Sequence, residues 1–191
     1  NFRFFPNLKH LEIKYNDECL NINRLSDKLE VFICPNIFSI SCIFPENLQK
    51  ICYNCSGNIN ISYLKNLKSV TLVDSHLEFI ENLQFARVPE YLDIQHLARH
   101  NSNEKIVIPE GVKHLIISDW EIGIVLPKSL EILETGESLN IETYKNIPDN
   151  LKVLRFNRLH SMFFYSAIYN YYDIPPFIET VEFGLVMSDY N

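Results

Sequence analysis

Glycine is scarce in this sequence, with five residues among 191. The patterns GxGxxG, GxxxxGK(S/T) and GxSxG are all missing, which excludes the usual phosphate-binding loops and the nucleophile elbow. Cysteine is also sparse, and its odd count of five does not suit a scaffold held together by disulfides. No apolar run reaches the roughly 18 to 20 residues that a membrane-spanning helix needs, so we expect no membrane partner.

Basic residues are few and scattered. Seventeen Lys and Arg stand against 24 Asp and Glu, for a formal net charge of −7, which argues against a nucleic-acid partner because that affinity depends on clustered cations. No set of nucleophile, base and orienting residue stands out from the spacing, so we expect no catalytic residues, no cofactor, no metal and no small-molecule substrate. With 47% apolar residues, the chain should nevertheless fold around a core.

The sequence does contain an internal repeat. An apolar residue and a proline are followed, after two spacers, by a short segment of the form Leu-x-x-Leu-x-apolar. The clearest copies start at Phe44-Pro45, Ile108-Pro109, Leu126-Pro127, Ile147-Pro148 and Ile174-Pro175. Phe5-Pro6 begins the same unit with one spacer missing, and other copies lack the proline. We expect the proline to sit at a corner before each strand.

The middle apolar positions of these segments recur at a nearly constant interval. They are Leu11, Phe32, Ile51, Val70, Leu92, Leu115, Leu133, Leu154 and Val181, separated by 21, 19, 19, 22, 23, 18, 21 and 27 residues. A β-meander would not place the same proline before most strands. The period therefore predicts a solenoid of about nine repeats, which occupies residues 1–191 as a single domain with a parallel inner sheet and mostly irregular or short-helical outer segments.

The repeats resemble the leucine-rich repeat superfamily. Leu8-x-x-Leu11-x-Ile13-x-x-Asn16 matches the leucine-rich pattern, although most other copies lack the Asn after the strand, so an asparagine ladder is not expected there. Segments such as Leu126-Pro127-Lys128-Ser129-Leu130-Glu131-Ile132-Leu133 are most similar to FNIP-type repeats. The resemblance implies an α/β solenoid, a source in amoebae or the giant viruses that infect them, and an F-box ahead of the repeats.

That resemblance implies a non-catalytic protein–protein interaction module with a protein partner, in the setting of substrate recognition by an F-box-type ubiquitin ligase. Because the chain starts at Asn1 rather than Met, we expect a truncated N-terminus, and we expect a cytoplasmic location, in the host cytoplasm if the protein is viral. Two alternatives stay open. The repeats could be the targeting arm of an effector or enzyme whose catalytic part lies elsewhere, or a structural, virion-associated protein.

Two regions depart from the period. Leu77–Leu83 and, with less support, Leu92–His100 have the spacing of short helices. The last interval contains an aromatic insert, residues 158–175, that either covers the end of the core or anchors a partner through Phe163, Phe164 and Tyr169.

Alternation along the strands predicts which side chains face outward. One outward row is Glu12, Ile33, Cys52, Thr71, Asp93, Ile116, Glu134, Arg155 and Glu182, and the row beside it is His10, Val31, Lys50, Ser69, Tyr91, His114, Ile132, Val153 and Thr180. We expect Ile116, Ile132 and Val153 to form an apolar centre flanked by Glu134 and Arg155, as in a protein-binding patch on a concave face. The alternative is that a parallel sheet simply favours β-branched residues.

Cysteine and histidine spacing gives weaker signals. Cys52 and Cys55 form a CxxC, with Cys34 and Cys42 nearby, but no second pair completes a zinc site, and Cys34 falls on an inward position. We therefore interpret Cys34 as ordinary core. His96 and His100 would share a helix face without a third ligand, which favours two solvated side chains.

Overall fold

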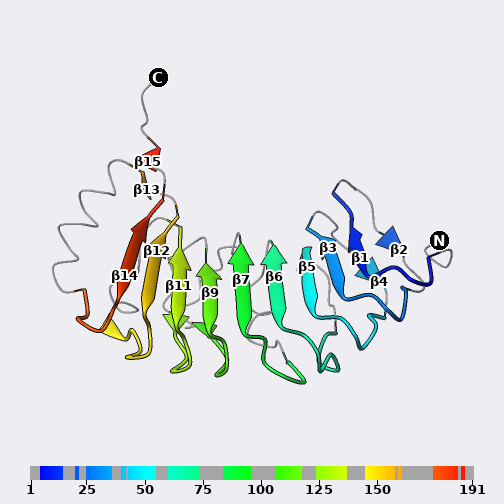
Figure 1. The fold of residues 1–191 in the computed structure, drawn as a ribbon, viewed down its shortest axis with the longest axis horizontal. Helices are drawn as coiled ribbons and strands as arrows, with labels where there is room; N and C mark the ends of the chain where they lie inside the picture. Colours follow the sequence, from blue (N-terminus) through cyan, green and yellow to red (C-terminus); the bar gives the residue numbers. More distant parts are fainter. Residues whose placement is uncertain are drawn as a thin grey trace. The chain divides into compact units, whose positions relative to one another are not determined.

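The computed structural model describes residues 5–14, 20–21, 25–35, 40–41, 43–54, 60–73, 84–95, 106–117, 124–136, 145–157, 159–160, 174–184 and 186–187. The chain divides into two compact units, residues 1–100 (unit 1) and 101–191 (unit 2). Each unit is a parallel β-solenoid, and its strands are drawn as arrows in Figure 1.

Unit 1 has five parallel strands that follow one another in sequence order. They are β1 (His10–Glu12), β3 (Val31–Cys34), β5 (Lys50–Asn54), β6 (Ser69–Val73) and β7 (Tyr91–Gln95). The middle residues Leu11, Phe32, Ile51, Val70 and Leu92 are Cα partners across neighbouring strands. The register predicted from the sequence is therefore confirmed at each of these pairings.

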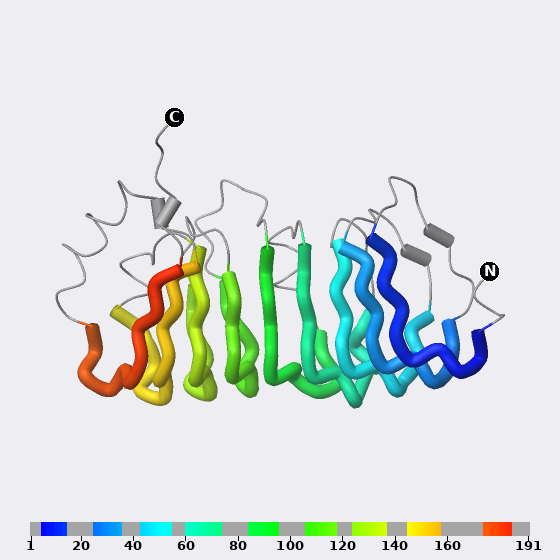
Figure 2. The backbone as a smooth tube through the Cα atoms, turned by 45° about the horizontal axis from the view of Figure 1, so that its top comes forward, coloured from blue at the N-terminus to red at the C-terminus, as the bar shows by residue number. Residues whose placement is uncertain are grey.

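Unit 2 has four parallel strands in the same arrangement. They are β9 (His114–Ile117), β11 (Ile132–Thr135), β12 (Val153–Phe156) and β14 (Thr180–Phe183). Leu115, Leu133, Leu154 and Val181 are Cα partners, so the register again agrees with the prediction. We call each strand with its preceding turn a rung. Figure 2 shows the rungs of each unit stacked beside one another.

The segments between these strands differ from the expectation. Three pairs of two-residue parallel strands lie there: β2 (Leu20–Asn21) with β4 (Ile40–Ser41), β8 (Ile106–Val107) with β10 (Ile124–Val125), and β13 (Leu159–His160) with β15 (Val186–Met187). The described residues contain almost no helix. The prediction of short-helical outer segments is therefore wrong for this part of the chain.

The helix expected over Leu92–His100 is also wrong where it is described. Its first residues belong to β7. Leu92 and Ile94 are buried at a spacing of two residues, which is the period of a strand and not of a helix. The segment Leu77–Leu83 lies outside the described residues, as do His96 and His100.

The core runs through the inward strand positions. In β3, β9, β11 and β12 every second side chain is buried, and the others are partly exposed. Phe32 is fully buried and its ring meets the edge of Phe44 at 5.2 Å between centroids. No rung could bury these side chains by itself, so the stack is what stabilises them.

A proline turn precedes the strand in most rungs. The carbonyl of Pro45 accepts a hydrogen bond from the amide of Leu48, and Pro127, Pro148 and Pro175 repeat this arrangement with Leu130, Leu151 and Ile178. In the first rung, where one spacer is missing, the carbonyl of Phe5 takes that place with Leu8. The prediction that the proline occupies a corner is confirmed.

Asparagine side chains link these turns from one rung to the next. The amide nitrogens of Asn47, Asn66 and Asn150 donate to the carbonyls of Asp27, Glu46 and Lys128 at 2.9, 3.0 and 2.7 Å. The asparagine ladder of this protein therefore lies before the strands, directly ahead of the first leucine in the three repeats that carry it. It satisfies turn carbonyls that no strand pairing reaches.

Candidate functional site

The predicted outward rows are continuous within each unit. In unit 1, Glu12, Ile33, Cys52, Thr71 and Asp93 are successive Cα partners. Thr71 and Asp93 are nevertheless buried, so the outward row is exposed only over its first three members. In unit 2 the same row is Ile116, Glu134, Arg155 and Glu182, beside His114, Ile132, Val153 and Thr180. We call these outward rows the open face of each unit.

The apolar residues predicted for a patch lie on the open face of unit 2. Ile132 and Val153 are direct Cα partners on β11 and β12, and both are partly exposed. Ile116 lies opposite Glu134 on the neighbouring strand β9. The structure thus brings Ile132 and Val153 together, whereas Ile116 lies in the same row as the charged residues Glu134 and Arg155.

A chain of polar contacts crosses this face. His114 Nε2 lies 2.6 Å from Glu134 Oε1, and Arg155 Nη1 donates to the same oxygen at 3.0 Å. Arg155 also donates to Glu182 from Nε at 2.8 Å, and Asn157 donates to Glu134 Oε2 at 3.1 Å. Four successive strands are therefore joined by side chains as well as by their backbones.

Glu134 is the centre of this chain. Burial is the largest influence and raises the pKa of its carboxyl, but hydrogen bonds from Asn157, Arg155 and His114 together bring that pKa below its ordinary value. Glu134 therefore stays ionised at neutral pH. A carboxylate held in this way suits a fixed structural acceptor better than a general base.

Arg155 is fixed by carboxylates on both sides. Hydrogen bonds to Glu182 and then to Glu134 raise the pKa of its guanidinium. Its side chain is 31% exposed, so the guanidinium remains accessible while its orientation is set. Such a group can present its remaining donors to a partner with little loss of side-chain entropy.

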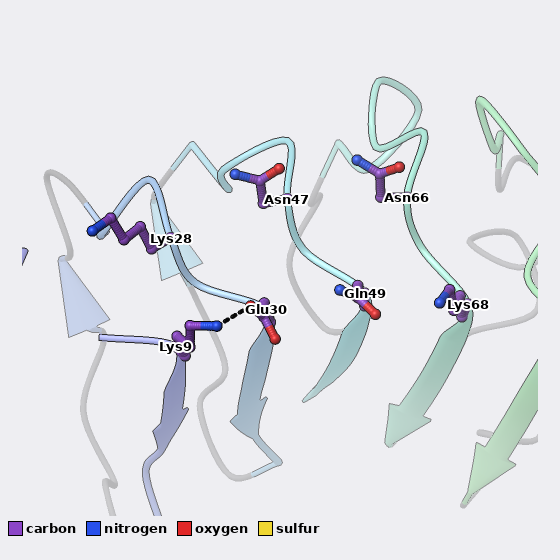
Figure 3. Close-up of a pocket in the computed structure, with 7 residues that line it drawn as sticks. All are labelled: Lys9, Lys28, Glu30, Asn47, Gln49, Asn66 and Lys68. Carbon is purple, nitrogen blue, oxygen red and sulfur yellow. Dashed lines mark hydrogen bonds and ion pairs between the residues drawn. The ribbon is translucent and has the colours of Figure 1, made fainter. Parts of the chain in front are cut away.

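A polar groove of about 480 Å³ lies at the start of the strands in unit 1. Figure 3 shows its lining as two rows, one on the turns and one at the strand starts: Lys28, Asn47 and Asn66, then Lys9, Glu30, Gln49 and Lys68. Most of these groups already have partners, because Lys9 is bonded to Glu30 at 2.9 Å, Lys28 to Asn7 at 2.7 Å, and both asparagines belong to the ladder. The groove therefore offers few free groups to a ligand.

The cysteine positions behave as core rather than as reactive sites. Cys34 is buried, as predicted, and burial, followed by the neighbouring Cys52, raises the pKa of its thiol to about 12. Burial and then the charge of Asp93 raise the pKa of Cys52 to about 11. Cys42 and Cys55 lie outside the described residues, and no group of His, Cys, Asp and Glu within the described part could hold a metal ion.

The second predicted anchor is the aromatic insert. Phe163, Phe164 and Tyr169 of the aromatic insert are outside the described residues. Sequence reasoning placed His114 and Glu182 on the outward rows but not in the predicted patch, and it missed Asn157. For Asn157 a signal was available, since it follows Arg155 by two residues and continues the outward alternation.

Comparisons with known proteins do not place the chain in a family. No protein-family model, no curated protein and no solved structure gives a significant match. None of the helical segments described is long and apolar enough to span a membrane.

Proposed function

We propose that this chain is a non-catalytic protein-interaction module that binds a protein partner through the open face of unit 2. The observation that carries the proposal is the pair Ile132 and Val153, side by side and partly exposed, next to a row of interlocked charges. An apolar centre with a polar border is the usual anatomy of a protein interface.

The polar chain contributes rigidity to this surface. Because Glu134 and Glu182 both hold Arg155, the charged border is organised before a partner arrives. Pre-organisation lowers the entropic cost of association. A partner that fits would supply apolar side chains over Ile132 and Val153 and hydrogen-bond acceptors near Arg155.

The proposal also includes the type of repeat. We assign the repeats to the FNIP type on the proline-led pattern of Leu126–Leu133, and this type implies substrate recognition for an F-box ubiquitin ligase. That setting rests on the resemblance alone. The interaction module does not depend on it.

The test compares partner capture by two double variants of unit 2. Ile132→Asp/Val153→Asp places two charges on the open face and should abolish specific capture. Val107→Asp/Val125→Asp is the matched control, because Val107 and Val125 are also exposed, β-branched Cα partners but lie on the small sheet of β8 and β10. Circular dichroism establishes that both variants are folded.

Capture that survives in the first variant contradicts the proposal. Capture that is lost only in the control places the binding surface on the β8–β10 sheet instead.

A further inference from the structure

The polar groove of unit 1 follows from the pattern of the repeat. The first leucine of each repeat turns inward, so Leu29, Leu48 and Leu67 are buried, while the residues on both sides of each leucine are exposed or partly exposed. These flanking residues form the two rims of the groove: Lys28, Asn47 and Asn66 on the turns, and Glu30, Gln49 and Lys68 at the strand starts (Figure 3). The groove therefore runs along the rungs of β3, β5 and β6.

The lining of this groove is positively charged, although the whole chain is acidic. Three lysines and one glutamate line it, whereas the chain carries a formal charge of −7. Lys9 neutralises Glu30 at 2.9 Å. Lys28 donates to the uncharged amide oxygen of Asn7 at 2.7 Å, and Lys68 has no ion-pair partner among the described residues. The uncompensated charges are therefore those of Lys28 and Lys68, and salt screens acids farther away than about 8 Å.

These two lysines lie at opposite ends of the groove. Lys28 leads toward β3 on the turn rim, and Lys68 leads into β6 on the other rim, two strands farther along the stack (Figure 3). Neighbouring strands are about 4.8 Å apart, so the two positions are separated by roughly 10 Å along the stack. The bond from Lys28 to Asn7 holds its ammonium on the side away from β6. A single small anion would meet only one of the two cations, so the spacing favours a ligand with two separate anionic groups.

Amide side chains occupy the middle of the groove. Asn47 and Asn66 donate through nitrogen to the ladder, and their side-chain oxygens accept no hydrogen bond among the described residues. Gln49, which is partly exposed, has both its donor and its acceptor available in the same part of the chain. A chain of phosphates offers only acceptors and would set oxygen against oxygen here. A peptide main chain carries N–H and C=O groups in alternation, which these amides can match.

The equivalent positions of unit 2 lack this charge pattern. Ser129 and Asn150 occupy the turn rim there, without a cation. The strand starts alternate in sign as Lys113, Glu131 and Lys152. The separated pair of uncompensated cations is therefore a property of unit 1 and not of the repeat in general.

We propose that the groove of unit 1 binds an extended acidic peptide segment of a partner protein. One carboxylate lies at Lys28, a second lies at Lys68, and the main chain between them contacts Asn47, Gln49 and Asn66. Acidic residues three or four positions apart in an extended chain are separated by about 10 to 13 Å, which matches the span of the groove. The groove of about 480 Å³ has room for such a short segment. This site is separate from the open face of unit 2 and does not depend on the function proposed for it.

The experiment is fluorescence anisotropy of the whole chain with a short extended peptide that carries an uncharged dye, blocked ends and two glutamates four positions apart. The peptide should bind saturably, more weakly as salt is added, and the version with two glutamines should not bind. Lys68→Glu should weaken binding roughly three- to tenfold. Lys152→Glu is the matched control, because Lys152 is an exposed lysine at a strand start of unit 2, and it should bind like wild type.

An exchange of charge tests the placement of the peptide. Of the two peptides in which one glutamate is replaced by lysine, one should bind Lys68→Glu as tightly as the parent peptide binds wild type. Inorganic phosphate and tripolyphosphate should not displace the parent peptide at equal concentrations of charge.

Three results would overturn the proposal: equal binding of the glutamine peptide, equal weakening in Lys152→Glu, or displacement by either phosphate, which would indicate a site for simple anions. Failure of both lysine peptides to bind Lys68→Glu would overturn it as well. Ile132→Asp/Val153→Asp should bind the peptide like wild type, so this result and the test of the open face stay distinguishable.

Discussion

Among single residues, Glu134 has the largest influence on the open face of unit 2, because three side chains from the two neighbouring strands and the turn after β12 hydrogen-bond to it. His114 comes from β9 and Arg155 from β12, while Asn157 follows β12 directly. Loss of this one carboxylate would remove one hydrogen bond from each of these three side chains. The arrangement of the charged border is therefore tied to the ionisation of Glu134.

The stability of the protein should fall in acid partly through this group. The pKa of Glu134 is lower in the folded state than its ordinary value of 4.5, so its contribution is fully present above that value and is lost as the pH falls through the folded-state pKa. Glu134→Gln should flatten the acid limb of a plot of unfolding free energy against pH. Glu46→Gln, at an exposed turn, is the control and should follow the wild-type curve.

The two described thiols should react slowly in the folded protein. With a pKa of about 11 rather than 9.0, the thiolate fraction of Cys52 at pH 8 is roughly 100-fold lower than that of an ordinary thiol, and Cys34 is lower still. Iodoacetamide labelling followed by mass spectrometry should show both sites protected in buffer and modified in urea. Rapid labelling of Cys52, which is partly exposed, in the native protein would contradict its raised pKa.

At the scale of the element, asparagine side chains hydrogen-bond the turns before the strands to one another, independently of the strand pairing. Asn66 donates to the carbonyl of Glu46 across one rung boundary, so Asn66→Ala should lower the free energy of unfolding by about 1 kcal/mol. Asn7→Ala is the matched control, since no ladder acceptor for its amide lies within the described chain, and it should cost clearly less because it loses only the exposed bond from Lys28. Equal losses measured by urea unfolding would show that the ladder does not stabilise the stack.

The strand register was predictable because it depends only on alternation. A slip of one residue would turn Leu115 and Ile117 toward solvent, so the apolar pattern specifies the pairing strongly. The small sheets were not predictable, since two residues such as Ile106 and Val107 give no period. The ladder was hidden because other residues, Lys28 and Ser129 among them, replace asparagine in more than half of the rungs. The polar chain depends on side-chain conformations that strand alternation does not determine.

At the scale of the molecule, each stack should lose stability according to where it is damaged. Leu133 is fully buried between two rungs, so Leu133→Ala should cost about 2 to 5 kcal/mol. Val181 lies on β14, which pairs with one strand among those described, and it is partly exposed, so Val181→Ala should cost well under half as much. Urea midpoints that fall equally for both variants would contradict a stack whose rungs depend only on their neighbours.

The rung architecture also determines how the chain would respond to force. Because each strand is bonded only to the strands beside it, tension applied to an end strand loads its backbone bonds one rung at a time instead of shearing a whole sheet at once. Each step would release about 20 residues, or roughly 70 Å of extended chain. In an optical trap, the extension of unit 1 should therefore increase in small, nearly equal steps at low force. A domain that unfolds in a single event would instead give one large step.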